Sequence, residues 1–202
     1  MPFGEVVTVT GEMLAPLGGK LPEDTPQLRA LCERLVPGEA PTPLDVDDPA
    51  PPWAKVNECF VNVERAIAEH GGGLQVGWAL WEPMPRLMIE AELHGVWVDR
   101  AGGYRDVTPK AKGAKRILFL PDPVRTYDGR QVDNIRVSLV DDPLLTDYIR
   151  TWEQFYAVTN EGDLADYHGA WEDIWTPEME RLKRRREQLG LQIAAKYYGL
   201  GR

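Results

Sequence analysis

The chain has few cysteines, few histidines and no long apolar stretch, and each scarcity excludes a class of protein. Two cysteines among 202 residues are too few for a disulfide framework. His70 and His168 have no companions at ligand spacing, and no Cys-x-x-Cys pair occurs, which argues against a zinc site. No run of about 18 apolar residues is present, so the sequence predicts no membrane-spanning helix.

The N-terminus lacks the basic segment and long apolar stretch of a signal peptide, so we expect a cytoplasmic protein without membrane partners. The net charge of −9, from 32 acidic and 23 basic residues, disfavours nucleic acid as the main ligand, because phosphate backbones are bound by Lys and Arg. The one basic cluster covers 181–186. We interpret it as a solvated helix face paired with acidic neighbours; a nucleic-acid or acidic-partner contact is the alternative.

What the chain does contain is enough apolar material for a core, arranged as an α+β protein. Hydrophobic residues make up 43% of it and include seven Trp. A helix followed by alternating strands, and then further helices, indicates the α+β class. Thr25 and Asp142 each precede a proline and are predicted N-caps. We expect helices at 26–35, 58–70, from 142 onward and at 177–198, the last interrupted near Gly190, and strands at 5–10, 74–81, 87–98, 103–107, 116–120 and 132–139.

The proline-rich segment 37–53 separates the first helix from the middle of the chain. Its prolines exclude a helix or a central strand, so we expect an ordered wrap or a linker. We therefore divide the chain into an N-terminal extension (1–52), a core (53–140) and a C-terminal helical segment (141–202). No internal repeat is visible.

Three residues in a fixed order carry the chemistry that we infer: Cys59, His94 and Asp106. Cys59 opens the helix at 58–70, His94 lies in the strand at 87–98, and Asp106 follows the next glycine turn. A thiol at a helix start, an imidazole on a strand and a carboxylate on the following strand is a layout for cysteine nucleophilic catalysis. Alternation places His94 on the more polar face of its strand, together with Glu90 and Glu92. We interpret these two carboxylates as a solvated strand face rather than a functional pair.

The hairpin between His94 and Asp106 predicts their contact. If it is symmetric about Arg100, the two residues oppose each other directly, with Cβ atoms about 5 Å apart. An Asp opposite a His fixes the tautomer and orientation of the imidazole. A register slip would break this arrangement.

The position of Cys59 favours a thiolate. At a helix N-terminus, the macrodipole and the free backbone N–H groups stabilise negative charge. The same N–H groups, with the Asn57 side chain as a second donor, could hold an oxyanion. A buried, inert core thiol is the alternative for Cys59. We interpret Cys32 as an apolar packing residue of the first helix, and a Cys32–Cys59 disulfide is disfavoured.

Cys59 at a helix start, together with the segment from His94 to Pro109, resembles the transglutaminase-like branch of the papain-like cysteine proteins. The resemblance covers roughly residues 53–120. It implies a papain-like fold with Cys59 as nucleophile, His94 as base and Asp106 as the orienting residue. Trp53 stands six residues before Cys59, where papain-type peptidases have Gln. Trp53, Trp78 and Trp97 are candidates to line an acyl-binding groove, with core packing as the alternative use.

We therefore hypothesise a thiol-dependent amide or peptide hydrolase or acyl transferase that acts on a peptide, protein or small amide through a thioester. No metal or organic cofactor is implied. The second hypothesis is a non-catalytic papain-like binding or assembly protein that uses its C-terminal helices. The substrate, the acyl acceptor and the oligomeric state do not follow from the sequence.

Overall fold

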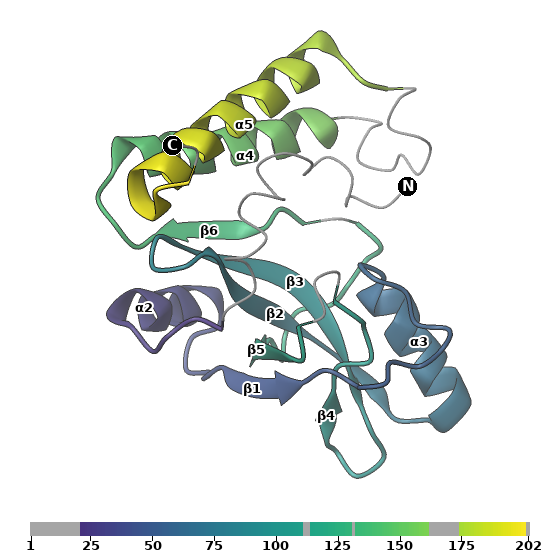
Figure 1. Cartoon of the computed structure of the whole chain (residues 1–202). Helices are drawn as coiled ribbons and strands as arrows, with labels where there is room; N and C mark the ends of the chain where they lie inside the picture. The colour runs from purple at the N-terminus through teal and green to yellow at the C-terminus, as the bar shows by residue number, and fades with distance from the viewer. Residues whose placement is uncertain (1–20, 111–113, 131, 162–173, 201–202) are drawn as a thin grey trace.

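The computed structural model describes residues 21–110, 114–130, 132–161 and 174–200. Within these ranges the protein is a mixed α+β fold of four helices and an antiparallel, nearly closed sheet (Figure 1). The strand predicted at 5–10 lies outside the described residues. The helices are α2 (Pro26–Leu35), α3 (Cys59–His70), α4 (Pro143–Thr159) and α5 (Pro177–Tyr198), and the strands are β1 (Thr42–Asp45), β2 (Gly73–Met84), β3 (Met88–Val98), β4 (Tyr104–Arg105), β5 (Arg116–Pro121) and β6 (Ile135–Ser138).

Local sequence signals set the beginnings of three helices. The side chains of Thr25, Asp142 and Thr176 accept hydrogen bonds from backbone N–H groups of the first turns of α2, α4 and α5, and a proline follows each of them. The two predicted caps are thus confirmed. The predicted interruption of α5 is wrong, because the helix continues through a buried Gly190. A mid-helix glycine costs only about 1 kcal/mol, and Leu189 and Ile193 on either side are buried in the core.

The sheet has the strand order β1-β5-β2-β3-β4, and β6 pairs with the first half of β3. The chain after β1 approaches the end of β4: Val46 and Asp106 form a bridge, and the Asp47 N–H donates to the Asp106 carbonyl at 2.8 Å. The proline-rich segment therefore supplies an edge strand of the same sheet as the central strands. On one side of β3, residues 92–96 pair with no described strand. The pairing with β6 stops at Ala91 of β3, and the pairing with β4 begins at Trp97.

The two faces of β3 have different surroundings. One face carries Ile89 and Ala91, which pack with α2, and Trp97, which packs with α3. The other face carries His94 and Val96, and the second of these packs with residues of β2 and β5 in a separate apolar cluster. His94 pairs with Gly77 of β2. His94 therefore lies on the opposite face of β3 from the apolar residues that pack against α2 and α3.

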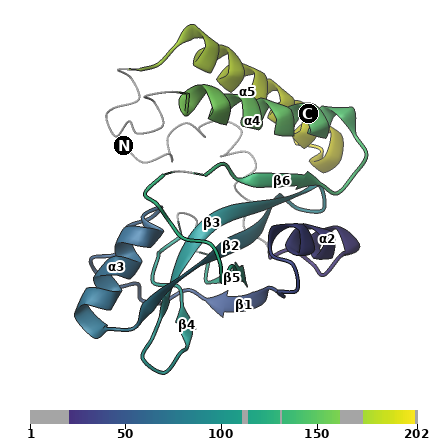
Figure 2. The same ribbon diagram turned by 180° about the vertical axis from the view of Figure 1, so that it is seen from behind.

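The C-terminal helices α4 and α5 lie side by side along β6 and the tip of the β2–β3 hairpin, as both views show (Figures 1 and 2). Their apolar side chains share one core with Met84, Leu87 and Met88 of the hairpin. Much of the basic cluster at 181–186 is paired within α5, since Arg181 bonds Glu178 and Arg184 bonds Glu180. Arg186 departs from the predicted solvated face, because it is buried with its guanidinium 3.8 Å from the centre of the Trp152 ring.

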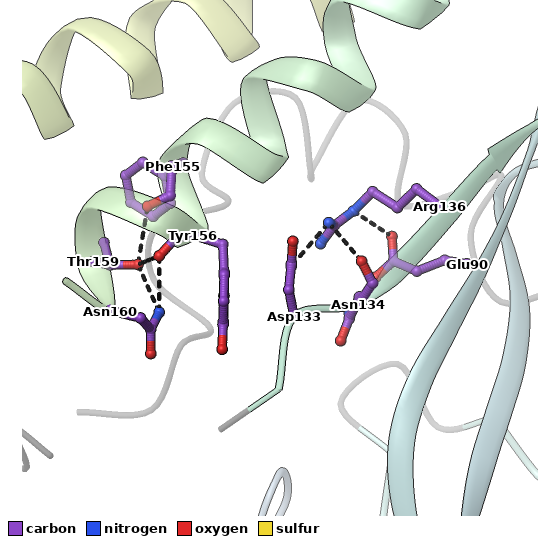
Figure 3. Close-up of polar contacts among 8 residues, drawn as sticks. All are labelled: Glu90, Asp133, Asn134, Arg136, Phe155, Tyr156, Thr159 and Asn160. Carbon is purple, nitrogen blue, oxygen red and sulfur yellow. Dashed lines mark hydrogen bonds and ion pairs between the residues drawn. The ribbon is translucent and has the colours of Figure 1, made fainter. Parts of the chain in front are cut away.

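A half-buried charge network links β3 to β6 and lies beneath the end of α4 (Figure 3). Arg136 forms ion pairs with Glu90 at 3.3 Å and with Asp133 at 3.0 Å, and its guanidinium lies over the Trp152 ring. The Asn134 amide donates to the second oxygen of Glu90. The interpretation of Glu90 as part of a solvated strand face is therefore wrong, because β6 brings a cation onto it. We call Glu90, Asp133, Asn134 and Arg136 the β6 cluster.

Candidate active site

Cys59 is the first residue of α3, as the sequence predicted. Glu58 is the N-cap and makes no side-chain capping hydrogen bond. By helix geometry, the first N–H groups of α3 have no acceptor within the helix. Asn57 is exposed and adopts a left-handed conformation, with φ of 63°, which turns the chain into the helix. The thiol of Cys59 is half-buried, and both cysteines are free.

The structure brings His94 and Asp106 into contact. Their Nε2 and Oδ2 atoms are 3.2 Å apart, and the two residues are 3% and 0% exposed. The other carboxylate oxygen of Asp106 accepts from the Thr108 N–H at 3.0 Å. Since Nε2 is engaged, Nδ1 is the ring nitrogen left to exchange a proton with a thiol.

The predicted register of this hairpin is wrong by two residues. Trp97 pairs with Arg105 and Val98 with Tyr104, so the hairpin is symmetric about residue 101 rather than 100. The five-residue turn closes with the Asp99 N–H on the Gly103 carbonyl. Asp106 therefore lies past the end of β4 and is not directly opposite His94. It approaches Nε2 through its side chain instead.

Lys110 is part of the site, although the sequence reasoning did not single it out. Its Nζ atom is 2.6 Å from Asp106 Oδ2 and 3.2 Å from His94 Nε2, and its side chain is 12% exposed. The available signal was its position four residues after Asp106. That spacing became meaningful only because residues 106–110 fold back onto β3.

Electrostatics couple Cys59 to this group. Burial and the Lys110 cation lower the pKa of His94, whereas the charges of Asp106 and Cys59 and the hydrogen bond to Asp106 raise it by more, so that the pKa reaches about 9. Burial raises the pKa of Asp106, but His94 and Lys110 outweigh it and hold this pKa below its usual value. Glu92, two residues before His94, is half-buried, and burial raises its pKa. The arrangement favours an imidazolium on His94 beside the Asp106 carboxylate.

A second layer of hydrogen bonds ties α3 to the segment that holds Asp106. The buried Asn62, one turn after Cys59, donates to the Thr108 hydroxyl at 3.2 Å and to the Lys55 carbonyl at 2.7 Å. Thr108 in turn donates its N–H to Asp106. The helix of Cys59 and the carboxylate beside His94 are therefore held together by buried polar contacts.

An aromatic pair lies next to Cys59. The rings of Phe60 and Tyr127 are stacked, with centroids 3.6 Å apart and planes 3° apart. Tyr127 is therefore stacked on the residue that follows Cys59, and burial and the charge of Cys59 raise the pKa of Tyr127. A Cβ atom on Gly95 would meet the Phe60 ring at 3.0 Å, so glycine at this position allows α3 to approach the strand beside His94.

The three tryptophans proposed for the groove are not gathered at Cys59. Trp53 donates to Glu69, near the far end of α3. Trp78 is buried in the core under α2, on the face of β2 opposite to that of Gly77. Trp97 packs against α3 and donates to the Gly71 carbonyl at 2.8 Å. The structure thus uses all three for packing.

Searches with the chain found no matching family model, no matching curated protein and no matching solved structure. No cluster of three or more His, Cys, Asp or Glu able to hold a metal ion occurs among the described residues. In the same part of the chain, no helix combines the length and the apolar character that crossing a bilayer requires. The site must therefore be interpreted from its own geometry.

Proposed function

We propose that this protein is a thiol-dependent amide or peptide hydrolase or acyl transferase of papain-like architecture. The observation that carries the proposal is the buried 3.2 Å contact between His94 and Asp106. Cys59 stands at the uncapped start of α3, and this helix is tied to the Asp106 segment by the hydrogen bonds of Asn62 and Thr108. A nucleophile, a base and a group that orients the base are the parts that such catalysis needs.

Each part has a role in the proposed reaction. The Cys59 sulfur attacks the acyl carbon, and the developing oxyanion is stabilised by free N–H groups of the first turn of α3. His94, held by Asp106, gives a proton from Nδ1 to the leaving amine as the carbon–nitrogen bond breaks. The product is a thioester on Cys59. Water or a second amine, deprotonated by His94, then attacks the thioester and releases the thiol.

The substrate side of the proposed site is partly apolar. Phe60 and Tyr127 form a stacked wall beside the thiol, and the exposed Val61 follows on the first turn of α3. We infer that the acyl group lies against this wall. Trp53, Trp78 and Trp97 are not part of this proposal, because they pack elsewhere.

A non-catalytic role for the C-terminal helices has less support. Many apolar residues of α4 and α5 are buried against each other and against the β2–β3 hairpin, so these are already used within the chain. The neighbouring surface of α5 carries Arg–Glu pairs. A partner would have to compete with these contacts.

The test is the pH dependence of Cys59 alkylation by iodoacetamide. It compares Cys32→Ser, which leaves one thiol, with the same chain carrying His94→Ala. The proposal expects fast alkylation at neutral pH that falls about tenfold or more without His94, because the imidazolium stabilises the thiolate. Slow alkylation that is indifferent to His94 would show a structural cysteine and end the proposal.

A positive result would be followed by a screen of amide and peptide substrates. A Cys59-linked acyl intermediate should be seen by intact-mass spectrometry and should disappear in Cys59→Ala. Circular dichroism of Cys59→Ala, expected to match the parent, serves as the folding control. The ratio of hydrolysis to transfer is then read by adding an acceptor amine.

A further inference from the structure

Lys110 lies within the His94–Asp106 contact. Its Nζ atom is 2.6 Å from Asp106 Oδ2 and 3.2 Å from His94 Nε2, and these two atoms are themselves 3.2 Å apart. Three polar atoms thus form a closed triangle in a nearly buried setting. A Cys–His–Asp triad needs one side of this triangle, the contact between His and Asp. The other two sides require an explanation.

The hydrogens available allow two arrangements that exclude each other. An ammonium group donates three hydrogen bonds and accepts none, and a carboxylate only accepts. If His94 Nε2 carries a hydrogen, it donates to Asp106, and Lys110 can bond Asp106 alone. If Nε2 is bare, it accepts from Lys110, and the hydrogen of a neutral ring is then on Nδ1.

We propose that Lys110 is a positioning residue that selects the tautomer of neutral His94 by donating to Nε2, so that the ring hydrogen stays on Nδ1. This inference rests on the proposed function for its consequence. A neutral ring with a hydrogen on Nδ1 cannot take the proton of the Cys59 thiol at that atom. Lys110 therefore opposes proton transfer from the Cys59 thiol to neutral His94 until it releases Nε2 and bonds Asp106 alone. The imidazolium form of His94 is held by Asp106.

The charged surroundings of His94 come from each neighbouring segment. The chain after β4 supplies Asp106 and Lys110, α3 supplies Cys59, and β3 itself supplies Glu92. The strand beside β3 contributes Gly77 at this level, and β5 contributes the Phe119 ring at 6.5 Å. Among these groups Lys110 is the cation that touches the ring, so its removal should change both the proton position and the titration.

The test is ¹⁵N–¹H NMR of the His94 ring in the full chain. The sequence has three histidines, and His94→Gln assigns the signal by subtraction. Above the titration midpoint, the wild-type ring should carry its hydrogen on Nδ1 and the Lys110→Met ring on Nε2. Loss of the cation should also raise the midpoint by about one pH unit. Lys115→Met is the matched control, because Lys115 makes an exposed 2.7 Å pair with Asp48, and it should change neither property.

The same tautomer in wild type and Lys110→Met, or an unmoved midpoint, would overturn the inference. If Lys110→Met does not fold, Lys110→Gln tests the loss of charge with a shorter side chain, and Lys110→Arg should keep the wild-type midpoint. Cys59 alkylation separates the two ideas. Alkylation that needs His94 without a tautomer change defeats the inference alone, whereas a tautomer change with alkylation indifferent to His94 defeats the proposed function alone.

Discussion

Two charge clusters lie along the same face of β3, and they differ in how fully their charges are matched. In the β6 cluster, Arg136 has a carboxylate on each side and an aromatic ring against its guanidinium. At the other end of the strand, Lys110 and His94 compete for the same oxygen of Asp106. A matched network holds structure together. A network with two exclusive arrangements can move a proton.

The two clusters also differ in what surrounds them. The β6 cluster lies beneath the end of α4, where Thr159 and Asn160 bond back to the carbonyls of Phe155 and Tyr156 (Figure 3). The His94 cluster is tied through Thr108 to Asn62 of α3, and the uncapped first turn of this helix carries a half-buried cysteine. The helix end at the β6 cluster has side-chain hydrogen bonds to its carbonyls. The helix start at the His94 cluster has backbone N–H groups without a side-chain cap. We expect substitutions in the first to change stability and substitutions in the second to change reactivity.

The largest effect is expected from Arg136→Met. It leaves Glu90 and Asp133 without their buried cation, so the free energy of unfolding should fall by about 3–5 kcal/mol. Urea unfolding measures it. Arg181→Met, which removes an exposed pair, is the control and should have almost no effect. If Arg136→Met were as stable as the parent, or if it slowed Cys59 alkylation while remaining folded, the division between the two clusters would be wrong.

The pH dependence of stability should identify the His94 cluster. The pKa of His94 is about 9 in the folded protein and lies above the free value of 6.5. The stabilisation of the fold by protonated His94 is therefore fully present below pH 6.5 and is lost as the pH rises to 9. The loss should be about 3 kcal/mol, at 1.36 kcal/mol per pKa unit. Urea unfolding between pH 6 and 9.5 tests this against His94→Gln, whose profile should be flatter. Parallel profiles would contradict the prediction.

A smaller effect is expected from Asp106→Asn. The variant keeps the size of the side chain but removes the charge that holds the imidazolium, so alkylation of Cys59 at pH 7 should slow about tenfold, or about 1.4 kcal/mol. Cys32→Ser is the background, and Asp133→Asn in the β6 cluster is the matched control. An equal response of the two variants would show that the carboxylates play the same part.

The smallest effect is expected from Thr108→Val. This nearly isosteric change removes one acceptor of the buried Asn62 amide, and the free energy of unfolding should fall by about 1 kcal/mol. The alkylation rate should change by less than twofold, because the Thr108 N–H bond to Asp106 is kept. Thr146→Val, on the first turn of α4, is the control. A large change in alkylation would place Thr108 in the reactive network itself.

The sequence-based predictions succeeded where neighbouring residues decide the outcome. Thr25 and Asp142 cap helices because their side chains accept from N–H groups two or three residues ahead. Alternation predicted the faces of β3, since successive side chains point to opposite sides of a strand. The contact between His94 and Asp106 was expected for the right reason but in the wrong register, because the five-residue turn moved the point of symmetry by one residue.

The sequence by itself therefore determined the helix starts, the order of β2 to β6 along the chain and the placing of a thiol at a helix N-terminus, because these depend on local geometry and on side-chain periodicity. The edge strand β1 was not predicted, since it forms in the proline-rich segment by pairing with β5. Only the tertiary structure decided that Lys110 touches His94, that Arg136 neutralises Glu90 and that the tryptophans are used for packing. These contacts join residues of separate segments. No local pattern specifies them, since they follow from the way the sheet curves and from what packs against its open edge.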